Sequence, residues 1–318
     1  MRAVAIRDFG GTPELMELPE PAPGRGEVEI RLHVAGVNPF DWKIADGILR
    51  KRPHVFPLVL GVDGAGEVAR SGDGAARFRE GDRICGQFLH DPVGVGTYAE
   101  FATVPESIGV ARIPQGVGFA AAAAIPTAGM TALDAIDFLA PAPGSSLLII
   151  GASGGVGSYA VQLAAARGAR VIGTARGGSP DRLRALGAEL VIDPERGDLA
   201  ELVHSVHPAP VDALLDLGSD RARFAQLTTL VRDGGAAATT VYAADVEELA
   251  RRGIRGRNLD LQPRKELLEP LLEMVARGRL AVPISREVPI VEAPVALADS
   301  RARGSVGKTV IRIRSDAG

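Results

Sequence analysis

Cysteine and histidine, on which cross-links and many metal sites depend, are scarce in this chain. Cys85 is the one cysteine among 318 residues, so a disulfide within the chain is impossible and a four-cysteine structural zinc site is excluded. We expect Cys85, which lies in a short strand-like run, to be a buried and unreactive thiol. The five histidines show no ligand spacing, and we expect His204 and His207 at a solvated helix end. The sequence therefore predicts no metal site.

Long apolar runs and a strong net charge are also missing. No window resembles a membrane span, and the N-terminal residues contain neither an apolar signal segment nor a cleavage site. The formal net charge is only −3, with basic residues scattered among acidic ones. This pattern favours neither nucleic acid nor a membrane surface as a partner. We expect a cytoplasmic protein.

Two kinds of pattern divide the sequence, which is long enough for two domains and is 46% hydrophobic. Over the first hundred or so residues, alternating patterns such as residues 27–37 and frequent glycine turns indicate many short strands in an irregular antiparallel barrel. From residue 120, apolar runs alternate with helical segments, which predicts a parallel sheet covered on both faces. The predicted strands of this sheet are residues 147–150, 171–174, 190–192, 213–217 and 236–241.

The C-terminal part of the chain shows a third pattern. Residues 265–277 predict a helix in which Pro270 produces a kink or a late restart. A strand over residues 282–288, a short alanine-rich helix and a last strand over residues 308–314 follow. The pattern alone would allow these closing strands to extend either domain.

A glycine-dense turn follows the apolar run 147–150 and leads at once into a helical segment that ends at Gly168. Strand, turn, helix and second strand fit within about 30 residues, the length of a phosphate-binding unit. Gly154 lets the backbone approach a pyrophosphate and Gly157 lets the helix pack on its strand, while Ala152 replaces the first glycine of the usual fingerprint. We predict a bound dinucleotide, contacted by Ala152, Ser153, Gly154, Gly155, Val156 and Gly157.

The end of the second strand predicts which dinucleotide is bound. After Thr174, Ala175 and Arg176 stand where a site selective for NAD usually has an acidic residue. A guanidinium can donate forked hydrogen bonds to a 2′-phosphate, worth roughly 1.5 to 3 kcal/mol, or about one to two decades in affinity. We therefore predict NADPH as the cofactor, in preference to NADH. Ser179 is a further candidate contact, although it also has the features of the N-cap of the next helix.

Five segments carry a family resemblance. They are Gly36–Asp41, Leu60–Val68, Gly96–Phe101, Gly151–Gly157 and Gly307–Val310. Their order and spacing resemble the medium-chain dehydrogenase/reductase superfamily, specifically its zinc-free quinone oxidoreductase branch, over nearly the whole length of the chain. The resemblance implies an α/β fold with a GroES-like β-barrel domain and a Rossmann domain, whose doubly wound parallel sheet binds NADP.

The resemblance also implies how the domains divide and associate. The GroES-like catalytic domain is expected over residues 1–120, completed by residues 268–318, and the Rossmann domain over residues 121–267. A homodimer is expected, commonly built in this family by pairing edge strands of the nucleotide sheets.

Three positions distinguish the chain from the alcohol dehydrogenase branch of the superfamily. There, a cysteine and a histidine followed by an acid hold catalytic zinc, and the corresponding places here are Asn38, Val62 and Asp63. Phe40 stands where a hydroxyl residue would relay the alcohol proton. Asparagine binds zinc poorly and valine does not bind it, so an unactivated alcohol or ketone is not the expected substrate.

Hydride transfer without a metal requires an acceptor that is already electron-poor, such as a quinone or a carbon–carbon double bond conjugated to a carbonyl. The protein would contribute orientation, a dry pocket and hydrogen bonds to the developing oxygen anion. Asn38 is the candidate catalytic donor at the nicotinamide, and Phe40, Thr127 and Met130 are candidate substrate-pocket walls.

Structural roles compete with these assignments. Asn38 and Pro39 could simply form a turn, Asp41 could cap the following helix, and Thr127 could pack where the domains join. For Lys308 we expect a solvated position in an edge turn rather than a contact with the cofactor.

By resemblance, further cofactor contacts come from the ends of the later strands, since ligands bind at the carboxyl edge of open parallel sheets. These candidates are Leu217, Gly218, Ser219, Thr240, Val241 and Tyr242, with Asn258 from the chain returning past the nicotinamide. Thr131 is a further candidate cofactor contact, although it could instead pack where the domains join.

Three other functions compete with an NADPH-dependent quinone or enone reductase. An enoyl-thioester reductase of a biosynthetic pathway fits the same residues. A non-catalytic NADPH-binding sensor or structural protein would keep the fold without the chemistry. A zinc-dependent alcohol dehydrogenase is the least favoured because of Asn38 and Val62.

Overall fold

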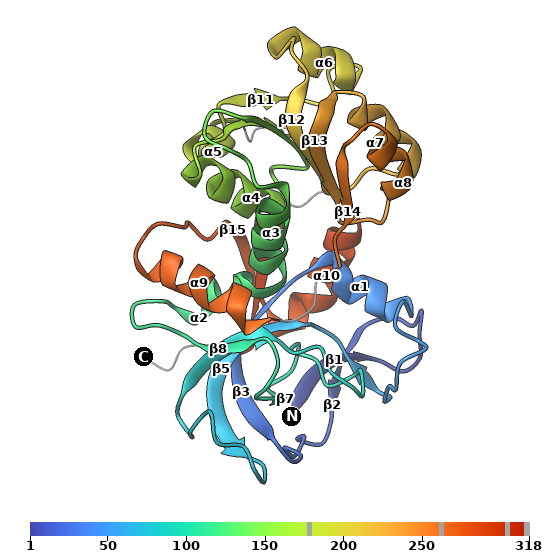
Figure 1. The fold of residues 1–318 in the computed structure, drawn as a ribbon. Helices are drawn as coiled ribbons and strands as arrows, with labels where there is room; N and C mark the ends of the chain where they lie inside the picture. The colour runs from blue at the N-terminus through green and yellow to red at the C-terminus, as the bar shows by residue number, and fades with distance from the viewer. Residues whose placement is uncertain (177–179, 261–263, 303–305, 315–318) are drawn as a thin grey trace. The chain divides into compact units, whose positions relative to one another are not determined.

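The computed structural model describes residues 1–176, 180–260, 264–302 and 306–314, and Figure 1 shows its ribbon. The chain divides into two compact units. Unit 1 comprises Met1–Met130 and Gln262–Gly318, and unit 2 comprises Thr131–Leu261. Among the described residues, no helix combines the length and the apolar character needed to cross a membrane.

Unit 2 is built on a six-stranded sheet in which all neighbouring strands are parallel. The order is β11-β10-β9-β12-β13-β14, so the chain runs outward from β9 to β11 and then returns to β12 on the other side. This is the strand order of a Rossmann fold, and it places the switch point between β9 and β12. The strands are β9 (Ser146–Ile150), β10 (Arg170–Thr174), β11 (Leu190–Ile192), β12 (Val211–Asp216), β13 (Val231–Thr239) and β14 (Arg255–Asn258).

The parallel sheet predicted from the apolar runs is confirmed, and β14 is an additional strand that the pattern does not predict. Its residues 255–258 have the sequence RGRN and include no apolar side chain. The segment becomes a strand because it pairs with β13, where Ala237 faces Gly256. Tertiary pairing rather than local propensity therefore determines this element.

Three helices of unit 2, namely α6, α7 and α8, begin at aspartate caps. Asp198 accepts hydrogen bonds from two backbone N–H groups of α6, and Asp220 and Asp245 each accept one from α7 and α8. Phe224 of α7 and Leu249 of α8 pack into the same core as the strands. The helices are α4 (Gly155–Ala166), α5 (Pro180–Ala185), α6 (Leu199–Val206), α7 (Arg221–Thr228) and α8 (Val246–Arg251).

Unit 1 contains a seven-stranded mixed sheet and a three-stranded antiparallel sheet. In the larger sheet the order is β15-β16-β3-β5-β6-β8, and β7 also pairs with β3. Only β15 and β16 pair in parallel; the other pairs are antiparallel, as the alternating patterns predict. The strands are β1 (Arg2–Ile6), β2 (Glu14–Glu17), β3 (Glu27–Gly36), β4 (Leu58–Val59), β5 (Asp63–Ser71), β6 (Arg83–Gln87), β7 (Phe101–Pro105), β8 (Val110–Arg112), β15 (Ile284–Pro289) and β16 (Lys308–Arg312).

The last strand of the chain pairs with an early strand in this larger sheet. β16 runs antiparallel to β3, with Val310 opposite Gly36, so the closing strands extend unit 1. Pro270 lies inside a helix whose assigned span is unbroken, not at a restart. The helical elements associated with unit 1 are α1 (Pro39–Ala45), α2 (Phe119–Ala124), the start of α3 (Pro126–Leu139), α9 (Lys265–Ala276), the short 3-10 helix η1 (Ile290–Glu292) and α10 (Ala293–Arg301).

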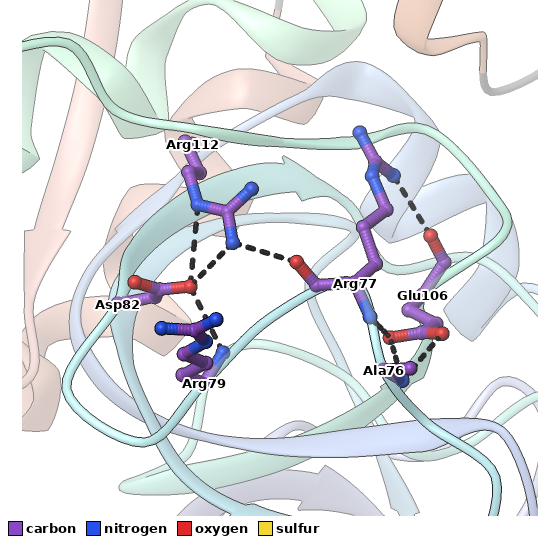
Figure 2. A network of polar contacts seen from close by, with 6 residues as sticks. All are labelled: Ala76, Arg77, Arg79, Asp82, Glu106 and Arg112. Carbon is purple, nitrogen blue, oxygen red and sulfur yellow. Dashed lines mark hydrogen bonds and ion pairs between the residues drawn. The ribbon is translucent and has the colours of Figure 1, made fainter.

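A polar network fixes the connection between β5 and β6 (Figure 2). The Glu106 carboxylate accepts hydrogen bonds from the backbone N–H groups of Ala76, at 2.9 Å, and Arg77, at 2.7 Å. Arg112 of β8 donates to Asp82 at 2.7 Å and to the carbonyl oxygen of Arg77 at 2.6 Å. These contacts tie the loop down directly before β6, the strand that ends in Gln87.

Candidate functional site

The turn after β9 has the backbone geometry of an anion site. Gly151 has a φ of 79°, which favours glycine, and its N–H donates to the Thr174 hydroxyl at 2.9 Å. Gly154 is the N-cap of α4 in an extended conformation. The first N–H groups of a helix have no acceptor within it, and they coincide with the positive end of its dipole. Ser153 through Val156 are partly exposed, so a phosphate group can reach these donors.

Close packing explains two residues of this turn. A Cβ on Gly157 would lie 2.3 Å from the carbonyl oxygen of Gly151, whereas a Cβ on Gly154 would meet nothing nearer than 3.5 Å. Gly157 is therefore required by packing, and Gly154 leaves open space beside the helix end. Ala152 is fully buried, and it is accommodated because the facing residue of β10 is Gly173, where a Cβ would come within 3.0 Å of the Ala152 methyl.

The end of β10 presents one exposed cation. Thr174 and Ala175 are buried, and Arg176 is the first exposed residue of the connection. The Arg176 guanidinium is 67% exposed and lies 3.8 Å from the Glu195 carboxylate, a contact too open to hold the side chain firmly. Arg176 is therefore available to an anionic ligand. Ser179 lies outside the described residues.

The ends of β12, β13 and β14 lie along the same carboxyl edge as the turn, because all six strands are parallel. Leu217 is half-buried, and its N–H donates to the carbonyl oxygen of Ile150 across the switch point. The Ser219 hydroxyl donates to buried Asp216 at 2.7 Å, and the Asn258 amide exchanges two hydrogen bonds of 3.0 Å with the backbone of Ala244. Both side chains thus hold the shape of loops at this edge.

Three other candidates at this edge are more open: Gly218 and Val241 are exposed, and Thr240 is half-buried. Thr131, by contrast, is buried on α3. Tyr242 is 62% exposed and adopts a φ of 57°, a conformation that non-glycine residues adopt rarely. Burial raises the pKa of the Tyr242 hydroxyl, and a hydrogen bond to Asp260 raises it further.

Unit 1 contains a second candidate site, a buried polar network at the ends of β3, β5 and β16. The Lys308 ammonium donates to the side-chain oxygen of Asn38 at 2.6 Å and to the carbonyl oxygen of Val37 at 2.8 Å. The Asn38 amide nitrogen then donates to Asp63 at 2.8 Å. Lys308 is only 4% exposed, so the expectation of a solvated lysine in an edge turn was wrong.

The network continues from Asp63 through Thr127 to Gln87. The Thr127 hydroxyl donates to Asp63 at 2.6 Å and its backbone N–H donates to the same carboxylate at 3.0 Å. The Gln87 amide nitrogen donates to the Thr127 hydroxyl oxygen at 2.7 Å. Burial raises the pKa of Asp63, while the Lys308 ammonium and the hydrogen bonds from Thr127 and Asn38 oppose that shift. Burial lowers the pKa of Lys308, and Asp63 opposes that shift in turn.

A second carboxylate, Asp41, closes the network at the start of α1. It accepts hydrogen bonds from the backbone N–H of Asn38 at 2.7 Å, the Tyr98 hydroxyl at 2.7 Å and the backbone N–H of Val62 at 3.0 Å. Asp41 is the third residue of α1 and thereby caps its own helix. Burial raises the pKa of Asp41 to about 7, although the hydrogen bonds from Tyr98 and Asn38 lower it.

The predicted pocket walls lie in this unit as well. Met130 is fully buried, and Phe40 is half-buried against the core of unit 1. Cys85 is buried, as expected, and burial raises the pKa of its thiol far above the usual range, which disfavours the reactive thiolate.

Comparison with known proteins identifies the family. Residues 24–115 match the alcohol dehydrogenase GroES-like domain, and residues 155–254 match the domain called zinc-binding dehydrogenase. Over 98% of this chain and 98% of the relative, the sequence is 32% identical to the chloroplast envelope quinone oxidoreductase homolog of Arabidopsis thaliana. The chain belongs to the medium-chain dehydrogenase/reductase family.

Two further family members extend the comparison. The solved structure of the quinone oxidoreductase from Coxiella burnetii aligns with a TM-score of 0.89 at 29% identity, covering 99% of each chain. The 2-methylene-furan-3-one reductase of Solanum lycopersicum is 32% identical over 64% of this chain and 54% of its own. The predicted family and fold class are thus confirmed. The chain is an oxidoreductase of the medium-chain dehydrogenase/reductase family, which uses a nicotinamide cofactor and acts on small molecules.

The unit 1 network contains the three positions that, by resemblance, distinguish this chain from the alcohol dehydrogenase branch. By resemblance, Asn38, Val62 and Asp63 occupy the zinc-ligand positions of the alcohol dehydrogenase branch, and here the lysine ammonium is bonded to Asn38. Within the described parts of the chain, no three or more His, Cys, Asp and Glu side chains are grouped so that they could hold a metal ion.

Sequence reasoning missed Gln87, Tyr98 and the burial of Lys308. One signal for Lys308 was available: side chains alternate along a strand, so Lys308 shares a face with buried Val310. No local pattern indicates that Gln87 would reach Thr127, because their proximity depends on strand pairing between β5 and β6.

Proposed function

We propose that this protein is an NADPH-dependent oxidoreductase that transfers hydride, without zinc, to a quinone or to a carbon–carbon double bond conjugated to a carbonyl. The relatives named above as quinone oxidoreductases and as a furanone reductase support both acceptor classes. The observation that carries the zinc-free assignment is the Lys308 ammonium, 2.6 Å from Asn38. The lysine ammonium already occupies the side-chain oxygen of Asn38, which a metal ion at this place would need as a ligand. A metal ion would also bring a second positive charge close to the ammonium, which is electrostatically unfavourable.

The cofactor preference is supported by the end of β10. A bound dinucleotide would be held by the first turn of α4 and by the residues around Gly154, where the open space and the donors fit a pyrophosphate. Arg176, exposed and weakly paired, would donate to the 2′-phosphate of NADPH. Leu217, Gly218, Thr240, Val241 and Tyr242 would form the rest of the cofactor edge.

The chain contributes orientation and hydrogen bonds rather than an activating metal. When bound, the reduced nicotinamide supplies the hydride. Lys308 donates to the side-chain oxygen of Asn38, which fixes the orientation of the carboxamide and turns its NH₂ group towards the other partners. One of its N–H bonds goes to Asp63, and the other is only weakly engaged, 3.5 Å from the carbonyl oxygen of Gly36. We propose that this second N–H stabilises the developing oxygen anion of the substrate.

A substrate panel tests this function. We expect stopped-flow measurements to show oxidation of NADPH by benzoquinones and by simple enones, with NADH used poorly. Tight binding of NADPH without oxidation by any quinone, enone or enoyl thioester would instead favour a non-catalytic binding protein. Activity confined to enoyl thioesters would favour a biosynthetic enoyl reductase.

We also propose a homodimer in the cytoplasm. β14 ends the order of the described parallel sheet, so its outer backbone groups can pair with a second copy. Light scattering after size exclusion should give twice the 33.1 kDa mass of the chain. Cys85 has no second cysteine to pair with, so nothing in the chain requires an oxidising compartment, and cell fractionation tests the location.

A further inference from the structure

Gln87, at the end of β6, carries a buried oxygen that no group in the described part of the chain satisfies. The residue is 2% exposed, and its side-chain oxygen Oε1 has no hydrogen-bond partner. The amide nitrogen of the same side chain is well bonded, donating to the Thr127 hydroxyl at 2.7 Å. Buried carbonyl groups are nearly always paired, so this one requires a specific explanation.

The hydrogen-bond network determines which way the Gln87 amide faces. A hydroxyl has one hydrogen, and Thr127 donates its hydrogen to the Asp63 carboxylate at 2.6 Å. The Thr127 oxygen must therefore accept from its other neighbour, which requires the NH₂ of Gln87 at that position. Turning the amide over would place two acceptors against each other with no hydrogen between them.

Charged groups determine which partner donates and which accepts along this chain of hydrogen bonds. Asp63 accepts from three donors, namely the Asn38 amide at 2.8 Å and the backbone N–H and hydroxyl of Thr127 at 3.0 and 2.6 Å. Lys308, bonded to Asn38, adds a positive charge on the same side. The carboxylate is thus held as an acceptor, and the last group of this chain of hydrogen bonds is the Gln87 carbonyl.

We propose that Gln87 is a ligand-binding residue, whose side-chain carbonyl accepts a hydrogen bond from an N–H or O–H donor of a bound molecule. The inference rests on the proposed function, which involves two molecules with such donors. One is the nicotinamide, whose carboxamide carries N–H groups. The other is the reduced acceptor, whose hydroxyl is an O–H donor. Gln87 is one hydrogen bond from Thr127, a proposed wall of the substrate pocket.

The test compares ligands with and without the donor, first on the wild-type protein. Titrations would give the Kd for NADPH, NADH and the 3-acetylpyridine analogue of NADPH, in which a methyl ketone replaces the carboxamide. Parallel titrations would compare hydroquinone with its dimethyl ether, which lacks both hydroxyls. The two pairs are NADPH with its acetylpyridine analogue, and hydroquinone with its dimethyl ether. In one of these pairs, we expect the member that carries the donor to bind about three- to tenfold more tightly, which corresponds to one hydrogen bond.

The variant Gln87→Met then removes the acceptor at nearly constant volume. We expect it to abolish the preference within that pair, while the melting temperature of the unliganded protein does not fall below that of the control. The matched control is Thr97→Val, which removes a buried hydrogen bond from Thr97 to the backbone oxygen of Asp63 without touching Gln87. It should keep the ligand preference.

The outcomes separate the possible donors. If Gln87→Met loses the preference for NADPH over the acetylpyridine analogue, the donor belongs to the cofactor. If it loses the preference for hydroquinone over the dimethyl ether, the donor belongs to the reduced acceptor. Equal affinities within both pairs in the wild type, or preferences that Gln87→Met leaves intact, would overturn the proposal and indicate a bridging water. A wild type that prefers NADH contradicts the cofactor prediction alone, because the Gln87 comparison can be made with the acetylpyridine analogue of NADH.

Discussion

At the scale of single residues, Arg176 tests the cofactor preference. We predict that Arg176→Ala lowers the ratio of kcat/KM for NADPH over NADH about 10- to 100-fold, because roughly 1.5 to 3 kcal/mol of charge-assisted hydrogen bonding is lost. The matched control is Arg170→Ala, which removes an exposed arginine from the amino end of the same strand, where it pairs with Glu189. An unchanged ratio in Arg176→Ala would contradict the assignment.

Lys308 is the residue on which the unit 1 network depends electrostatically. We predict that Lys308→Met lowers stability by about 3 kcal/mol or more, since it leaves Asp63 as a buried charge without a compensating cation. Adding Asp63→Asn to that variant removes the orphaned charge and should restore part of the loss. Thermal melts of the single and double variants measure both effects, and a Lys308→Met protein as stable as wild type would show that the ammonium is dispensable.

Asp41 gives a pH dependence whose sign can be worked out. Burial raises its pKa from 3.8 to about 7 in the folded state, so the native protein binds a proton that the unfolded chain has released. The free energy of unfolding should therefore fall as the pH rises from about 4 to about 7, by roughly 1.4 kcal/mol per pH unit at most. Asp41→Asn cannot titrate, so urea unfolding at several pH values should give a flatter dependence for this variant. Equal slopes would contradict the shift.

At the scale of secondary-structure elements, the turn into α4 separates packing from binding. Gly157→Ala would place a Cβ 2.3 Å from the Gly151 carbonyl oxygen, and we predict a clear loss of stability. Gly154→Ala meets nothing within 3.4 Å and should fold normally, but its methyl group would occupy the space beside the α4 donors. Melting temperatures should thus fall for Gly157→Ala and stay normal for Gly154→Ala, whereas NADPH titrations should show weaker binding for Gly154→Ala. Equal effects of both on NADPH binding at normal stability would contradict this division.

The elements also show where reading the sequence succeeds. The strands of the parallel sheet that contain apolar runs were predicted, because a strand buried on both faces must be apolar along its length. β14 was missed because its charged sequence takes its conformation from pairing with β13. The fingerprint turn is local and was therefore predictable. The unit 1 network was not, since Lys308 and Asn38 are 270 positions apart and meet only when β16 pairs with β3.

At the scale of the whole molecule, the candidate cofactor site and the buried polar network lie in different units of the chain. Unit 2 supplies the carboxyl edge at which a dinucleotide can bind, and unit 1 supplies a buried polar network in which the Lys308 ammonium bonds to Asn38. The two family-model matches, one in each unit, show that both parts belong to one oxidoreductase of the medium-chain dehydrogenase/reductase family. Under the proposed metal-free hydride transfer, only an electron-poor acceptor can receive the hydride, and the metal-free site would thereby determine substrate choice.

The most direct measurement of that claim is stopped-flow oxidation of NADPH by a benzoquinone, on protein dialysed against a chelator and assayed for zinc in the same sample. We predict turnover without stoichiometric zinc, and no oxidation of simple alcohols with NADP⁺. Turnover that disappears on chelation and returns when zinc is added would contradict metal-free hydride transfer.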